Sequence, residues 1–100
     1  MGKPHIELPK ETISAFCKKW HIRKLSLFGS VLRDDFGPES DIDMLVVFEE
    51  DHLPDLITLS GMELELGDTL GHKVDLRTPE DLSPYFREEV VSAAVEQYAA

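Results

Sequence analysis

The sequence predicts an α/β (α+β) fold in which a small central mixed sheet of about three strands is flanked by helices. Two observations carry this prediction. Apolar residues recur at helical spacing in two long segments, and short apolar runs that end at Gly or Pro turn signals lie between and after them. A chain of 100 residues with 42% hydrophobic and 30% charged residues has the size and composition of one globular domain. We therefore expect residues 1–100 to form a single domain.

Three segments predict helices that pack on the sheet. Residues 9–21 form an amphipathic pattern with Pro9 in the first turn, and residues 54–70 form a second one that Gly71 ends. Ser83 and Pro84 predict the N-cap and first position of a last helix. The expected buried stripes are Ile13, Phe16, Cys17 and Trp20 in the first helix, Leu59, Met62, Leu66 and Leu70 in the second, and Val91, Ala94, Val95 and Tyr98 in the third.

Three short segments predict strands, at residues 23–28, 42–48 and 73–77. The second is a continuous apolar run, as expected for a strand that is covered on both faces. A short helix is expected at residues 30–36, and residues 36–40 read as a turn. The predicted order is helix, strand, short helix, strand, helix, strand, helix, which is typical of a sheet with helices packed on it.

Composition excludes several classes of function. The net charge of −10 argues against direct binding of nucleic acid, whose phosphates would be repelled, and suits the capture of divalent cations or docking on a basic partner. No apolar run approaches the length of a membrane span, and no signal-peptide core is present, so we expect a cytoplasmic protein. The single Cys17 is expected to be a buried thiol. The four histidines show no metal-ligand spacing and are taken as incidental.

Asp41 and Asp43 flank one residue at the start of the clearest predicted strand, so their side chains point to the same face. Two adjacent carboxylates repel each other, and a divalent cation removes that repulsion. Mg²⁺ prefers one or two carboxylates together with waters and substrate phosphates. The alternative is that Asp41 caps a turn and Asp43 is an exposed strand residue, since Asp-x-Asp alone is a weak signal.

Gly29-Ser30 follows a predicted strand and opens a predicted helix. Backbone amides at such a junction face an incoming anion, Gly allows a phosphate to approach closely, and the Ser30 hydroxyl can donate a further hydrogen bond. A plain strand-to-helix turn has the same appearance. The combination is more specific than either part, because Gly29-Ser30 is followed, ten residues later, by Asp41-x-Asp43.

The pattern Gly-Ser-(ten residues)-Asp-x-Asp resembles the signature of the DNA polymerase β-like nucleotidyltransferase superfamily, and within it the minimal nucleotidyltransferases (MNT) of prokaryotes. Arg33 and Ser40 also match that family's pattern, whereas Leu32 stands at its usual Ala and Asp34 at its usual Gly. Two roles remain open for Arg33, a phosphate contact or an ion pair that braces the loop. Ser40 fits a backbone cap of the turn better than a substrate ligand.

The resemblance extends to Asp75, whose segment Val74-Asp75-Leu76 and following Thr78-Pro79-Glu80 match the third-carboxylate strand of the family. If this strand pairs with the one carrying Asp43, three carboxylates meet at one site, which is enough for two metal ions. The alternative is a strand-end residue that only pairs with Lys73 or Arg77.

By this resemblance, the chain is expected to move AMP from ATP to a hydroxyl with the help of Mg²⁺, two ions being bound by Asp41, Asp43 and Asp75. Gly29 and Ser30 would hold the leaving phosphates. Many minimal nucleotidyltransferases are antitoxins that bind a helical HEPN-type RNase toxin and adenylylate a tyrosine on it, so such a toxin is the expected partner and acceptor. Two alternatives stay open. The chain could be a non-catalytic module that blocks its partner sterically, or it could transfer a nucleotide to a small-molecule hydroxyl.

Overall fold

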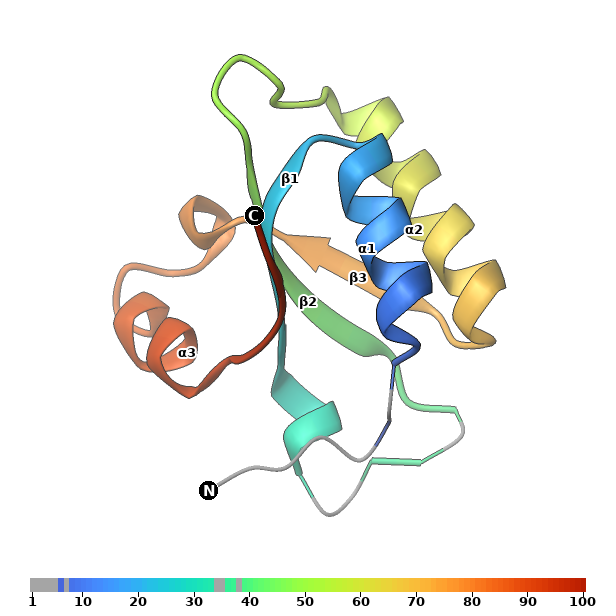
Figure 1. The fold of residues 1–100 in the computed structure, drawn as a ribbon. Helices are drawn as coiled ribbons and strands as arrows, with labels where there is room; N and C mark the ends of the chain where they lie inside the picture. The colour runs from blue at the N-terminus through green and yellow to red at the C-terminus, as the bar shows by residue number, and fades with distance from the viewer. Residues whose placement is uncertain (1–5, 7, 34–35, 38) are drawn as a thin grey trace.

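The computed structural model describes residue 6 and residues 8–33, 36–37 and 39–100. Its elements follow the order helix, strand, short helix, strand, helix, strand, short helix, helix, strand (Figure 1). Their bounds are α1 Lys10–Lys19, β1 Ile22–Phe28, the 3₁₀ helix η1 Gly29–Leu32, β2 Ile42–Phe48, α2 Leu56–Leu70, β3 Val74–Arg77, the 3₁₀ helix η2 Pro79–Asp81, α3 Arg87–Ala93 and β4 Val95–Ala99. The predicted α/β class is confirmed, with four strands instead of about three.

The four strands form one mixed sheet in the order β3-β2-β1-β4. β1 is antiparallel to both β2 and β4, whereas β2 and β3 are parallel. Parallel neighbours need a long crossover, and α2 provides it by carrying the chain from the end of β2 back to the start of β3. This crossover is what brings Asp75 beside Asp43.

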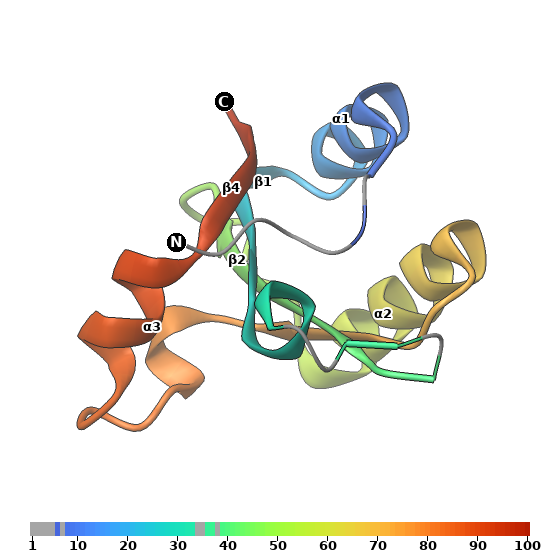
Figure 2. The same ribbon diagram turned by 90° about the horizontal axis from the view of Figure 1, so that it is seen from below.

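The main core lies between the sheet and the two long helices, which pack on the same side of it (Figures 1 and 2). Side chains alternate along the strands, so Ile42, Met44 and Val46 of β2 face this core and are fully buried. The other members are Leu8, Ile13, Phe16, Cys17, Ile22, Leu25, Leu27, Val31, Met62, Leu66, Val74 and Leu76. Cys17 is fully buried, as expected, and this burial raises the pKa of its thiol to about 12.

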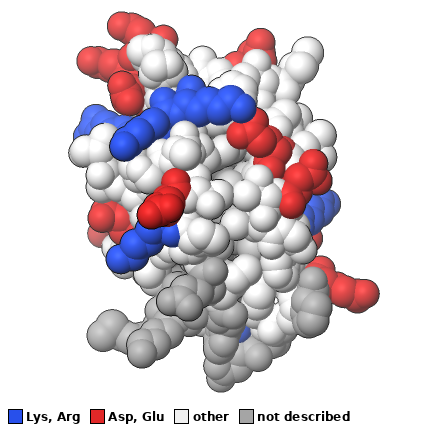
Figure 3. Space-filling view, turned by 45° about the vertical axis from the view of Figure 1, so that its right-hand side comes forward, with Lys and Arg blue, Asp and Glu red and all other residues white. Residues whose placement is uncertain are grey.

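The two helices are also joined at the surface. Lys19 of α1 pairs with Glu65 of α2 at 2.8 Å, and the Trp20 indole donates to the same carboxylate at 3.4 Å. The side view of the surface shows other Lys and Arg side chains next to Asp and Glu (Figure 3), so the net negative charge is interrupted by basic groups on this face.

Within the part of the chain that the structure describes, no helix is both long and apolar enough to cross a membrane.

The second long helix begins and ends as its sequence indicates. The Asp55 carboxylate caps the N-terminus by accepting from the Thr58 N–H at 2.7 Å. Gly71 ends the helix in the left-handed conformation with φ 72°. The helix therefore starts at Leu56, two residues after the predicted boundary.

The prediction of the last helix is wrong at both ends of that helix. Residues 84–86 form a turn, α3 has only seven residues, and the segment expected to complete its buried stripe, Val95 to Tyr98, lies in strand β4. The reason is the open edge of β1. An unpaired strand edge leaves its N–H and C=O groups without partners, and β4 pairs with that edge through a segment that contains the strand-favouring Val95 and Tyr98.

The short helix expected at residues 30–36 is also shorter than predicted. It is the single 3₁₀ turn η1, which ends where Arg33 adopts extended backbone. Residues 34 and 35, including the Asp34 that departs from the family pattern, lie outside the described residues.

Gly61 inside α2 and Gly71 at its end offer a matched test of this backbone. A Cβ added at Gly61 or at Gly71 meets nothing within 4 Å, but only Gly71 has a positive φ. Gly61→Ala is expected to stabilise the protein by about 0.5–1 kcal/mol, because it removes unfolded-state entropy inside a helix. Gly71→Ala is expected to destabilise it by about 1–2 kcal/mol, because Ala is strained at that φ. Urea unfolding of both variants measures the two free energies, and equal signs would contradict this account.

Candidate active site

Three carboxylates gather at one end of the sheet, on strands β2 and β3. Asp43 lies directly opposite Asp75 in the parallel ladder, and Asp41 precedes β2 by one residue. Because the flanking Ile42 and Met44 point into the core, Asp41 and Asp43 point to the opposite face. The pairing of the two strands, on which the expectation of a three-carboxylate site depended, is confirmed.

Asp43 is the central and least favourably placed of these charges. Burial raises its pKa, and the neighbouring carboxylates of Asp75 and Asp41 raise it further. The guanidinium groups of Arg77 and Arg33 act in the opposite direction but do not cancel the effect. The site therefore holds more negative charge than its own cations neutralise, which is the condition that favours a bound divalent cation.

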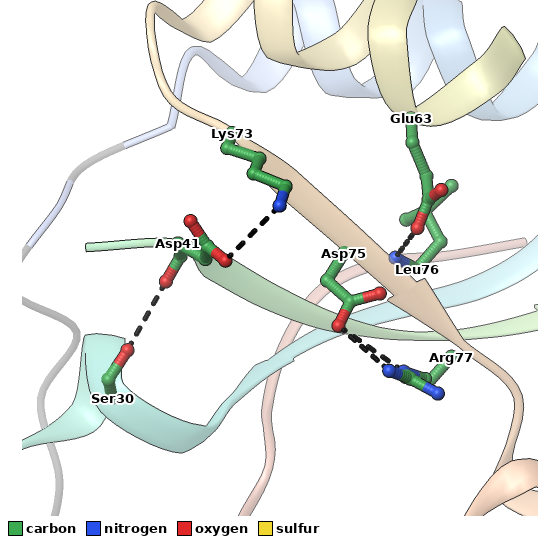
Figure 4. A network of polar contacts seen from close by, with 7 residues as sticks. All are labelled: Ser30, Asp41, Glu63, Lys73, Asp75, Leu76 and Arg77. Carbon is green, nitrogen blue, oxygen red and sulfur yellow. Dashed lines mark hydrogen bonds and ion pairs between the residues drawn. The ribbon is translucent and has the colours of Figure 1, made fainter. Parts of the chain in front are cut away.

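Two basic side chains border the carboxylates (Figure 4). The Arg77 guanidinium contacts Asp75 Oδ2 through both Nε and Nη2, at 3.3 and 3.2 Å. Lys73 lies 3.9 Å from Asp41 Oδ2 and is largely exposed, so this pair contributes little. Asp75 thus pairs with Arg77 and also lies opposite Asp43, which is the placement that the three-carboxylate hypothesis requires.

A fourth carboxylate, Glu63 of α2, reaches this group and was not predicted. Its Oε2 accepts the backbone N–H of Leu76 at 2.7 Å (Figure 4). Burial raises the pKa of Glu63, the Leu76 N–H lowers it, and the adjacent Asp75 raises it. Glu63 follows the buried Met62 in a helix with no other mark at that position, so the sequence carried no signal for this contact.

Gly29 lies against Asp43 in a conformation that other residues rarely adopt. Phe28 is opposite Asp43 in the β1–β2 ladder, so the chain reaches Gly29 immediately beside that carboxylate. Gly29 has φ 77°, and a Cβ at this position would collide with Asp43 Oδ2. Both the backbone conformation and the close approach therefore require glycine here.

The neighbouring residues shape the loop around this junction. Ser30 Oγ donates to the Asp41 carbonyl at 3.2 Å and so joins η1 to the start of β2 (Figure 4). The Ser40 hydroxyl accepts the Gly37 N–H at 3.0 Å, which confirms its expected role as a cap of the turn. Arg33 is exposed and lies near enough to lower the pKa of Asp43. The structure thus brings six of the seven predicted site residues to the same end of the sheet, while Ser40 supports the loop that leads to them.

Comparison with known proteins places the chain in a family. The sequence model of the nucleotidyltransferase domain family matches residues 9–96. A Methanocaldococcus jannaschii protein, named by inference as a protein adenylyltransferase, is 32% identical over 87% of this chain and 91% of its own length. The protein adenylyltransferase MntA of Thermococcus cleftensis is 37% identical over 59% of this chain and 58% of its own length.

Solved structures agree with this placement. One described by inference as a minimal nucleotidyltransferase has a TM-score of 0.70 and 32% identity over 86% of both chains. A crystal structure of a toxin–antitoxin with AMP-PNP has a TM-score of 0.75 at 22% identity, covering 93% of this chain and 75% of that one, and shows the fold. The chain belongs to the nucleotidyltransferase domain family, and its resemblance to the minimal nucleotidyltransferases is confirmed.

Gly29→Ala tests the close approach of the backbone to Asp43. The added methyl group strains the left-handed backbone and displaces the Asp43 carboxylate, so nucleotidyl transfer is expected to fall by at least about a hundredfold, the scale that displacing a positioned group reaches. Gly37→Ala is the matched control, because a Cβ at Gly37 meets nothing within 4 Å. Initial rates of label transfer from α-labelled ATP measure both. Full activity of Gly29→Ala would show that the contact has no role.

Asp43→Asn tests the unfavourable charge through stability. The folded-state pKa of Asp43 is above its ordinary value of 3.8, so the ionised group destabilises the fold at neutral pH, and this destabilisation disappears as pH falls through the folded pKa. In EDTA at neutral pH, Asp43→Asn is therefore expected to unfold at a higher temperature than the wild type, and the gap should narrow as the pH falls toward the ordinary value of 3.8. Asp68→Asn, which removes a charge from the exposed surface of α2, serves as the control. A lower melting temperature for Asp43→Asn at neutral pH would contradict the argument.

Proposed function

We propose that this protein is a Mg²⁺-dependent adenylyltransferase that moves AMP from ATP to a hydroxyl group, with a tyrosine of a HEPN-type toxin as the acceptor. The observation that carries the proposal is the alignment of Asp43 with Asp75 across the β2–β3 ladder, with Asp41 on the same face and Gly29 against Asp43. Membership of the nucleotidyltransferase family supports the reaction class.

The donor set fits Mg²⁺. Asp41, Asp43 and Asp75 offer carboxylate oxygens, which are the ligands that this hard cation prefers, and burial together with the two neighbouring carboxylates raises the pKa of Asp43. We assign two ions to these three residues. When bound, the ions neutralise the triphosphate and favour the deprotonated form of the acceptor hydroxyl.

The remaining work falls to residues of the chain. The acceptor oxygen forms a bond to the α-phosphorus, the bond from that phosphorus to the β-bridging oxygen breaks, and pyrophosphate leaves. Gly29 permits the leaving phosphates to approach the backbone, and Ser30 donates to them after releasing the Asp41 carbonyl. Asp75 takes the proton of the acceptor hydroxyl. Arg33 lies at the end of η1, where it can pair with a phosphate oxygen.

Arg77 has to yield part of its contact with Asp75 for this to occur. In the structure it occupies the carboxylate oxygen Oδ2 that faces it, at 3.2 Å. The pair is about half exposed at Arg77, so its separation costs little, and the guanidinium then remains beside the site as a cation for the triphosphate.

The acceptor is assigned from the structural neighbours and from charge. One neighbour of 19% identity is described as a tri-AMPylated Shewanella oneidensis HEPN toxin in complex with an MNT antitoxin, with a TM-score of 0.61 over 91% of this chain and 70% of that one. A net charge of −10 suits docking on a basic protein and opposes direct contact with nucleic acid. We place the protein in the cytoplasm, where ATP and such a toxin are both available.

Labelled ATP tests the reaction. The protein is mixed with Mg²⁺, a HEPN-type toxin as the partner, and ATP that is labelled at either the α- or the γ-phosphate. Label is expected on a tyrosine of the partner from α-labelled ATP only, and EDTA is expected to abolish it. Label from γ-labelled ATP would identify a kinase instead. Label on an added small molecule but not on the partner would support the alternative acceptor.

The double variant Asp41→Asn with Asp43→Asn separates catalysis from steric blocking. It is expected to lose label transfer and to lose neutralisation of the toxin in cells, while still binding the toxin in a pull-down. Full neutralisation by this variant would favour a binding module whose carboxylates have no catalytic role.

A further inference from the structure

Two histidines and a glutamate meet at the end of the sheet that lies away from the active site. His21 follows α1, whereas Glu49 and His52 belong to the loop between β2 and α2. One potential ligand atom from each side chain lies within 4.8 Å of the other two. The loop and the end of α1 lie at the top of Figure 1, and η1 lies at the bottom. Glu49 directly follows β2 and is six positions after Asp43, which is a distance of about 20 Å along an extended strand.

The backbone holds these three residues together. Glu49 N–H donates to the His21 carbonyl at 2.8 Å, and His52 N–H donates to the Glu49 carbonyl at 3.1 Å. His21 has φ 56°, and Asp51, which precedes His52, has φ 65°. These are the two non-glycine residues at positive φ in the described part of the chain. Residues held in such conformations are often part of a functional site, because surrounding contacts must stabilise them.

The imidazole of His52 is oriented as metal-binding histidines are. Its Nδ1 lies 3.0 Å from the Glu50 carbonyl, which can only accept, so Nδ1 carries the proton. The neutral ring then presents the lone pair of Nε2 as its ligand. A ring N–H donated to a backbone carbonyl is the usual outer contact of a metal-bound histidine.

We propose that His21, Glu49 and His52 form a Zn²⁺ site distinct from the Mg²⁺ site of the reaction. Two imidazoles and one carboxylate are a common set of three protein ligands for Zn²⁺, with water in the fourth position. Nitrogen ligands also select Zn²⁺ over Mg²⁺, which prefers oxygen alone. The bound ion joins the α1–β1 junction to the β2–α2 loop. These histidines had no recognisable ligand spacing in the sequence, because His21 and His52 are 31 positions apart and only the fold brings them together.

Binding requires a small rearrangement that can be observed. The two imidazole rings are stacked, with centroids 4.0 Å apart and an interplanar angle of 23°. A tetrahedral Zn²⁺ with bonds of about 2.1 Å sets its ligand atoms about 3.4 Å apart and needs each lone pair to point at the ion. The His52 ring is held by Glu50, so the His21 ring is the one that turns.

Titration of the tag-free protein with ZnCl₂, in buffer with saturating MgCl₂, tests the proposal. We expect one Zn²⁺ per chain by calorimetry, a higher melting temperature, and NMR shifts of the ring protons of His21 and His52. Loss of an outer contact of a metal ligand typically weakens binding about 10- to 100-fold, so loss of a ligand itself should weaken it at least about tenfold. His21→Asn keeps a residue that tolerates positive φ, and together with His52→Gln it should abolish the site.

A neighbouring glutamate provides the matched control. Glu49→Gln is expected to weaken Zn²⁺ binding, whereas Glu50→Gln, which removes the same charge from the same loop, should not. Asp41→Asn with Asp43→Asn should bind Zn²⁺ as the wild type does, so this result is independent of the proposed adenylyl transfer. Circular dichroism verifies that each variant is folded. No Zn²⁺ binding by the wild type, unchanged binding by His21→Asn with His52→Gln, or equal effects of the two glutamate changes would each overturn the proposal.

Discussion

Asp43 and Asp75 lie opposite each other because β2 and β3 run parallel in a fixed register, and the candidate active site depends on that pairing. A shift of one residue would turn Asp75 into the core and Leu76 toward solvent. The register is secured by burial, since Val74 and Leu76 both pack in the core cluster on the other face. The hydrophobic residues on either side of Asp75 thus determine where its charge lies.

The same pairing makes the site electrostatically unfavourable when no cation is bound. Burial and two neighbouring carboxylates raise the pKa of Asp43, so the folded protein holds a charge that its surroundings do not stabilise. The rest of the domain has to supply the stability that this arrangement costs. The sheet is anchored by fully buried side chains such as Ile22, Leu25 and Val46, and these lie on the face that the carboxylates avoid. Separation of the two faces of the sheet therefore allows a small core and a charged site to coexist.

Much of this was predictable from local patterns. The apolar run of β2 and the helical spacing in α1 and α2 predicted those elements, and the spacing of Gly29 from Asp41 and Asp43 predicted the residues that the structure brings together at the candidate site. The last helix was wrong because Val95 and Tyr98 satisfy a helical stripe as well as a strand, and only the open edge of β1 decides between them. Glu63 and the pair of His21 with His52 were missed for a related reason. Each contact joins residues from different elements, so no spacing along the chain records it.

The two borders of the sheet differ in what lies beside them. β4 covers the free edge of β1, so β3 forms the opposite border of the sheet. There the N–H of Leu76 is not left to solvent, because Glu63 of α2 accepts it at 2.7 Å. This contact ties the crossover helix to the residue that follows Asp75. It also places a carboxylate, instead of a fifth strand, next to the site, and a carboxylate repels Asp75 while it fixes the backbone. Strand addition is therefore opposed at this position of the border, and the Glu63 charge that opposes it adds to the negative charge around Asp75, which favours a bound cation.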